Sequence, residues 1–185
     1  MTNQNFKIDI KKVHWIDDEM GALDRCAHGN INVIIGNESM MQRDNWWNLS
    51  AAGLHLLRTL FENHTSNHQV GDVLVPFEGH HLDHHPNSRV HIETGGAYDL
   101  GSNWWVEHDN DNVRLITPNQ AITLPWIVYK NEVLKLVNAV EYLFNNSEDR
   151  ILPDDEYDKV AYFKFWSEWH ELKNKVELKN THNTQ

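Results

Sequence analysis

The N-terminal part of the chain alternates apolar and polar residues in the manner of β-strands. In "FKIDIKKVHWID" the alternation runs to Ile10 and then shifts phase to Val13, which predicts a strand with a bulge near Lys11. "NINVIIG" repeats the alternation and ends at Gly36. A glycine followed by an asparagine is typical of a turn, so this stretch predicts a second strand closed by a turn.

A different periodicity follows in "NLSAAGLHLLRTLFENH", where apolar residues recur at helical spacing. Asn48 or Ser50 is placed to cap the first turn. The opposite face carries His55, Arg58 and Glu62, which predicts a polar stripe in contact with solvent. We therefore expect an amphipathic helix.

From residue 69 to residue 124 the pattern becomes β-like again. The predicted strands are "QVGDVLV", "SRVHIE", "NWWVEH", "NVRLIT" and "QAITL". The "DNDN" at 109–112 predicts a hairpin connection between two of them. It also supplies oxygen ligands, but it lacks the glycine and the distal glutamate of a calcium loop.

The last third of the chain has the period of α-helices. After Pro125 an apolar stripe predicts one core-facing helix, and Pro153 followed by three acidic residues begins another. The stripe of this second helix runs from Tyr157 to Val176, and Phe163 and Trp166 are expected to widen it. Residues 1–180 thus predict a single α+β domain in which a mostly antiparallel sheet packs against about three helices, with a frayed tail at 181–185.

Composition narrows the classes of function. The formal net charge of −11 argues against nucleic acid as a partner, because the phosphate backbone would be repelled. The single cysteine, Cys26, excludes an internal disulfide and suits a reducing compartment. Neither a secretory signal nor an apolar stretch of membrane-spanning length is found. We expect a bacterial cytoplasmic protein that does not enter a membrane.

"FEGHHLDHHPNSRVHIE", residues 77 to 93, is rich in histidine. On a helix His80 and His84 could chelate one metal ion, as could the pair that follows them by one position. Gly79 and Pro86 leave room for little more than one turn, however, and no glutamate is placed as a base. A solvated loop, a metal site and a pH-sensitive surface all remain open. On the following strand His91 and Glu93 are expected to share a polar face.

A second set of possible ligands begins at Cys26 and His28. If the chain folds back, these residues could join His80 and His108 in a Cys-His₃ site, a ligand set that suits Zn²⁺. The alternative is a small buried cysteine beside a turn histidine. No nucleophile elbow and no phosphate-binding glycine loop occurs in the sequence.

Tryptophan is abundant, and it occurs in pairs. Adjacent residues of a strand face opposite sides of a sheet, so one member of each pair at 46–47 and 104–105 can meet something other than a single core. We expect Trp47 and Trp105 to contribute to a binding surface. A sheet that is buried on both faces is the alternative.

Short motifs spread along the chain resemble those of an uncharacterised group of small bacterial proteins. They are "CAHG" at 26–29, "LSAAGLHLLRTL" at 49–60, "GH" at 79–80, "WWVEH" at 104–108 and "FWSEWH" at 165–170. The resemblance implies an intact single domain and a bacterial source. It directs attention to Cys26, His28, His80 and His108 and implies no activity.

Two functions remain. In the first, the chain is a small acidic binding protein, such as an immunity protein that neutralises a basic toxin, with charge to steer the encounter and spare aromatic residues as anchors. In the second, it is a zinc protein or a metal-dependent hydrolase whose ligands come from the histidine-rich segment or from the Cys26 set.

Overall fold

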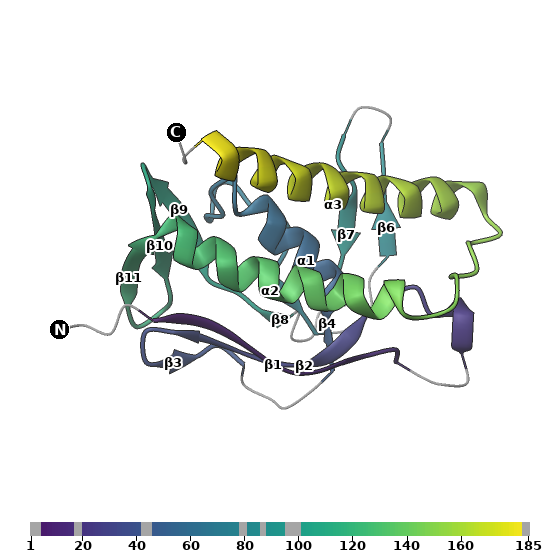
Figure 1. Ribbon diagram of the computed structural model, residues 1–185, viewed down its shortest axis with the longest axis horizontal. Coiled ribbons are helices and arrows are strands. Elements are labelled where there is room, and N and C mark those ends of the chain that lie inside the picture. Colours follow the sequence, from purple (N-terminus) through teal and green to yellow (C-terminus); the bar gives the residue numbers. More distant parts are fainter. Residues whose placement is uncertain are drawn as a thin grey trace.

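The computed structural model of the protein describes residues 5–16, 20–41, 46–77, 81–85, 88–94 and 101–182. Within these ranges antiparallel strands pack against three α-helices (Figure 1), which confirms the predicted α+β class. Among the described helices, none combines the length and the apolar character that crossing a bilayer requires.

The first sheet is built from β1 (Phe6–His14), β2 (His28–Ile35), β3 (Glu38–Ser39) and β4 (Trp47–Asn48), with β1, β3 and β4 all antiparallel to β2. The register of β1 against β2 shifts between Ile10 and Lys12, so the predicted bulge is confirmed. Gly36 adopts a φ of 62° in the turn after β2, a conformation that glycine reaches without strain.

Helix α1 (Leu49–Arg58) begins as predicted, because the Asn48 side chain accepts a hydrogen bond from the Ala51 N–H at 3.0 Å. The expected solvated stripe is wrong: His55 is 0% exposed and Arg58 is 2% exposed. Helices α2 and α3 and the strands cover α1 on all sides. Arg58 is tolerated there because its guanidinium binds Glu168 and two backbone carbonyls.

The middle of the chain forms short strands. β5 (Val75–Pro76) pairs with β8 (Gly101–Ser102), and β6 (His81–Asp83) pairs with β7 (His91–Glu93). β9 (Trp105–Asp109), β10 (Asn112–Ile116) and β11 (Ala121–Pro125) form a three-stranded sheet. Asp109 pairs with Asn112 across the β9–β10 turn, which confirms the predicted hairpin.

Helices α2 (Trp126–Asn145) and α3 (Glu156–His182) complete the fold. Figure 1 shows α2 lying over the first sheet and α3 on the side of α2 that is away from this sheet. Helix α1 lies between these two helices and the remaining strands. Most of the predicted apolar stripe of α3 is buried, and Trp166 packs against the core as predicted. Tyr157 and Phe163, in contrast, are 42% and 53% exposed, so Phe163 does not widen the stripe. The helix runs to His182, into the tail predicted to fray, and residues 183–185 lie outside the described ranges.

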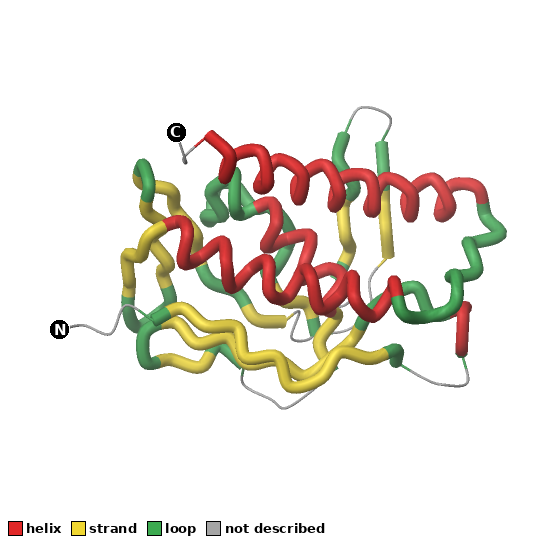
Figure 2. Tube along the Cα trace, viewed as in Figure 1, coloured by secondary structure: helices red, strands yellow, loops and turns green. Residues whose placement is uncertain are grey.

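The connection from α2 to α3 passes beside a short 3₁₀ helix, η1 (Gly21–Leu23), as Figure 2 shows. The Ile151 N–H donates to the Ala22 carbonyl at 2.8 Å. Arg150 donates to the carbonyls of Gly21 and Asp24, at 3.0 and 3.3 Å, and its guanidinium stacks on Trp15. These contacts fix the segment that leads into β2.

Candidate functional site

Three side chains with metal-binding atoms converge where this segment enters β2. Asp24, Cys26 and His28 each offer one ligand atom, and these atoms lie within 4.8 Å of one another. Asp24 and His28 are each 5% exposed, and Cys26 is half-buried. The three residues occupy every second position of the segment that bends at Cys26 and enters β2 at His28.

Backbone hydrogen bonds hold the Asp24 carboxylate in place. One carboxylate oxygen accepts the Ile16 N–H at 2.6 Å, and the other accepts the Cys26 N–H at 3.1 Å. Immediately beyond Cys26, the Ala27 N–H donates to the Ser50 hydroxyl at 2.8 Å. The segment is therefore tied both to the end of β1 and to the start of α1.

A second histidine lies next to the three. His14 pairs with His28 across β1 and β2. Its Nδ1 lies 2.7 Å from the Trp15 carbonyl oxygen. A carbonyl can only accept, so Nδ1 carries the proton, and the neutral ring presents Nε2 as an acceptor. Nε2 is buried and has no hydrogen-bond partner in the described part of the chain, so this lone pair is available to a ligand.

The local electrostatics keep the thiol protonated when no cation is present. Burial raises the pKa of Cys26 to about 12, and the Asp24 carboxylate acts in the same direction. A side-chain hydrogen bond with Asn48 and the charge of Arg25 oppose this rise. Burial also lowers the pKa of His28, with Asp24 in part opposing it. The site therefore favours a neutral imidazole, which is the form that binds metal.

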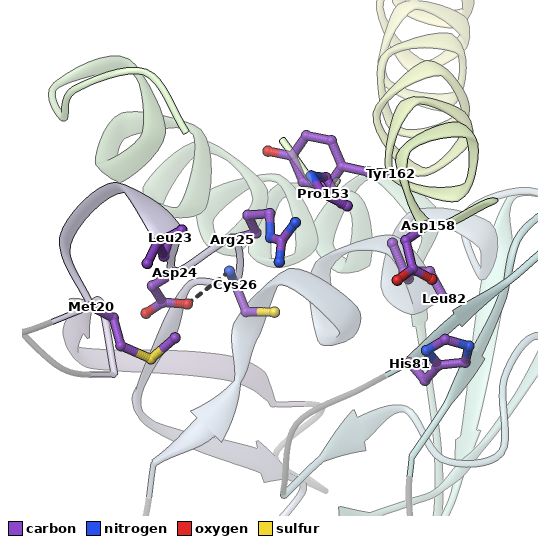
Figure 3. Close-up of a pocket in the computed structure, with 10 residues that line it drawn as sticks. All are labelled: Met20, Leu23, Asp24, Arg25, Cys26, His81, Leu82, Pro153, Asp158 and Tyr162. Atoms are coloured by element: carbon purple, nitrogen blue, oxygen red, sulfur yellow. Dashed lines mark hydrogen bonds between the residues drawn. The ribbon is translucent and has the colours of Figure 1, made fainter. Parts of the chain in front are cut away.

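A pocket of about 280 Å³ opens beside the cluster (Figure 3). Asp24 and Cys26 line one wall, and Figure 3 shows the Cys26 sulfur directed toward the space between this wall and β6. His81 and Leu82 of β6 and Asp158 of α3 lie on the opposite side. A ligand in the pocket would thus reach two of the three converging residues.

The arrangement suits a metal ion better than a cysteine nucleophile. A nucleophilic cysteine needs a depressed pKa, whereas burial and a neighbouring carboxylate raise the pKa of Cys26. A carboxylate, a thiolate and an imidazole are all zinc ligands, and in a tetrahedral site such atoms lie roughly 3–4 Å apart. The observed separations need only small side-chain movements to reach that value.

The set of ligands predicted from the sequence is only partly brought together. Cys26 and His28 share the cluster, and His80 lies outside the described residues. His108 lies on β9, where its Nε2 is 2.8 Å from the Thr59 carbonyl, so the ring is held at the C-terminal end of α1. His84 stacks on Tyr157 with ring centroids 4.3 Å apart. Neither of these two histidines belongs to the cluster.

Part of the histidine-rich segment forms the strands β6 and β7, the second of which lies in the predicted strand "SRVHIE". His81 pairs with Glu93, and Asp83 pairs with His91. His91 and Glu93 are exposed on one face, as predicted. Within the described residues, no group of three ligand atoms with such short separations includes a histidine of this segment.

The tryptophan pairs divide between core and surface. Trp47 is 5% exposed and packs edge-on against Phe77, so the prediction that it lies on a binding surface is wrong; its neighbour Trp46, 54% exposed, is the accessible member. Trp104 is buried, whereas Trp105 is half-buried with its ring 5.2 Å from that of His64. One ring of each pair therefore lies in the core.

Asp24 was missed by the sequence analysis, although the sequence contains a signal for it. In "DRCAH" the three ligand types occupy every second position, which on an extended chain places them on one side. The Cys26–His28 pair was predicted as a ligand set without the Asp24 carboxylate that precedes it.

Comparison with known protein families, with curated proteins and with solved structures finds no match to this chain. Its function therefore has to be inferred from its own residues.

Proposed function

We propose that the protein binds one zinc ion through Asp24, Cys26 and His28 and that this ion is the centre of a hydrolytic site. The convergence of the three ligand atoms within 4.8 Å, at the wall of a pocket, is the observation that carries the proposal. With three protein ligands a zinc ion keeps a fourth position for water or substrate, which is the coordination of hydrolytic zinc sites.

The surroundings of the ligands support this assignment. The Asp24 oxygens accept two backbone N–H groups, and Asn48, which caps α1, also contacts Cys26. Hydrogen bonds of this kind fix the orientation of metal ligands. The net charge of −11 also attracts cations to the molecule.

Metal analysis of protein freed of any histidine tag tests the proposal. We expect one zinc ion per chain, and we expect Cys26→Ser and His28→Gln to lose it. His84→Gln is the matched control, because His84 was also a predicted ligand but lies outside the cluster. Absence of zinc after zinc reconstitution and dialysis, or equal loss of zinc in the His84→Gln control, would overturn the proposal.

A second candidate, recognition of a basic protein as in an immunity protein, rests on exposed apolar side chains at the same end of the molecule. Ile16, Met20, Leu23 and Ile151 are 40–52% exposed. Met20 and Leu23 line the pocket, and the backbone hydrogen bond from Ile151 to Ala22 joins the two segments. The negative charge of the protein would attract a basic partner, and the exposed apolar side chains would be buried against that partner in the complex.

Capture from a lysate of the source organism, with two substitutions, tests this second candidate. A basic protein that is retained by the wild type and by Tyr142→Asp, but lost with Leu23→Asp, would support it. Tyr142 is 70% exposed on α2 and serves as the matched control. Equal capture by the two variants would count against the apolar surface.

A further inference from the structure

We infer that the pocket beside the zinc site binds a small carboxylate with an apolar body and that Arg25 is the residue that recognises the charge. The assignment names the substrate class of the proposed hydrolytic site, and in that respect it rests on the proposed function. Binding of the carboxylate itself can be measured with or without the metal.

Arg25 is the basis of the inference. The chain has 27 acidic residues and only 16 lysines and arginines, so an arginine has many carboxylates available. Arg58, Arg89 and Arg114 each pair with a glutamate. Arg25, in contrast, makes no hydrogen bond and no ion pair in the part of the chain that the structure describes, although it lines the pocket. A guanidinium left open in this way matches the two oxygens of an external carboxylate.

Among the described residues, the carboxylates that line the pocket make no ion pair with Arg25. The Asp24 oxygens are directed to the N–H groups of Ile16 and Cys26. Asp158 lies on the opposite side of the pocket (Figure 3). An anionic ligand would therefore point its charge toward Arg25 and its remaining atoms toward the other walls.

A neutral hydroxyl adds a second donor. Tyr162 lines the same pocket, and burial raises the pKa of its hydroxyl, which stays neutral. A neutral phenol hydroxyl carries one proton that it can donate. The hydroxyl can donate to a carboxylate oxygen without adding charge.

The remaining walls and the size define the body of the ligand. Met20, Leu23, Leu82 and Pro153 supply apolar surface. The volume of about 280 Å³ lies at the lower limit of pockets that hold drug-sized molecules. These features favour a compact carboxylic acid with an aliphatic or aromatic group over inorganic phosphate, which has no apolar part.

Calorimetric titration of the zinc-loaded protein with three probes tests the inference. The probes are 4-phenylbutyrate, its uncharged amide and inorganic phosphate. We expect the carboxylate to bind at least tenfold more tightly than either of the others. In protein saturated with zinc, Arg25→Gln should weaken carboxylate binding at least tenfold, whereas Arg89→Gln, an exposed arginine elsewhere, should have no effect.

The inference is overturned if the amide or phosphate binds as tightly as the carboxylate, or if Arg25→Gln binds like the wild type. Repeating the titration after chelation separates the two proposals. If the chain cannot hold zinc but still binds the carboxylate through Arg25, the proposed hydrolytic site is wrong and the pocket assignment stands. If the chain holds zinc but binds no carboxylate, the pocket assignment is wrong and the zinc site stands.

Discussion

His14 on β1 and His28 on β2 lie directly opposite each other, on the face of the sheet opposite to that of Phe6 and Ile8. This relationship depends on the bulge at Lys11. Phe6, Ile8 and the residues opposite them in β2 face the core. Without an extra residue, the alternation would carry His14 to that same side. The bulge reverses the alternation and brings the two imidazoles to one face.

The first prediction follows from this pairing. His14→Ala should weaken zinc binding about tenfold, because an acceptor beside the ligands can hold a water bound to the metal, and outer-shell partners contribute roughly 10–100-fold to affinity. Competition with a chromophoric chelator measures the change. His91→Ala, an exposed histidine on β7, is the control. Unchanged affinity in His14→Ala would show that Nε2 plays no part in the site.

Metal should also stabilise the fold. At a free zinc concentration of a hundred times Kd the expected gain is about 2.7 kcal/mol in the free energy of unfolding. The wild type should therefore melt several degrees higher with zinc than with a chelator, and Cys26→Ser should melt at the same temperature in both. A zinc-dependent rise in the Cys26→Ser variant would place the stabilising ion elsewhere.

Gly29 permits the close approach of β1 and β2 next to His28. A Cβ at this position would lie 2.1 Å from the Lys12 carbonyl oxygen and 2.6 Å from Leu49 Cδ1. Gly29→Ala should push the strands apart and destabilise the protein by about 1–3 kcal/mol, the usual cost of overpacking. Denaturant unfolding measures this loss, and zinc affinity should fall with it because His28 moves. Normal stability would mean that β1 shifts without cost.

Much of the fold follows from periodicity, whereas the partners of buried polar groups do not. Alternation predicted the β1 bulge, and "DNDN" predicted the β9–β10 turn. Arg58 was expected in solvent, because a helical pattern shows which face is apolar but not whether another helix covers the polar face. Asp24 was missed for a related reason. The spacing in "DRCAH" places Asp24 near Cys26 and His28, but the hydrogen bond that fixes its carboxylate comes from Ile16, and no local pattern encodes that contact.

The buried arginine gives a prediction with an internal comparison. Arg58→Ala removes a cation whose guanidinium binds Glu168 at 2.7 Å and two carbonyls, so the loss should be about 3–5 kcal/mol of the free energy of unfolding. Arg89→Ala removes an exposed partner of Glu62 and should cost no more than about 1 kcal/mol. Similar losses in denaturant unfolding of the two variants would contradict the burial of Arg58.

Acid should destabilise the protein through His64. Its Nδ1 accepts the Val70 N–H at 3.1 Å, and its Nε2 donates to the Asn103 side chain at 2.9 Å. Burial lowers the pKa of His64, the Asn103 hydrogen bond partly opposes this, and the charge of His68 adds to it. The native state therefore keeps the ring neutral, while the unfolded chain takes up a proton near pH 6.5.

The sign of the pH effect follows from this difference. Because the unfolded state binds more protons, stability is complete above about pH 6.5 and falls as the pH drops toward the pKa of the folded state. One such group changes the free energy of unfolding by at most about 1.4 kcal/mol per pH unit. His28 acts in the same direction, so the comparison is made in a His28→Gln background with chelator present. There, His64→Gln should be less stable at pH 8 and should lose less stability between pH 7 and pH 5.5. An unchanged acid slope would show that His64 does not carry the effect.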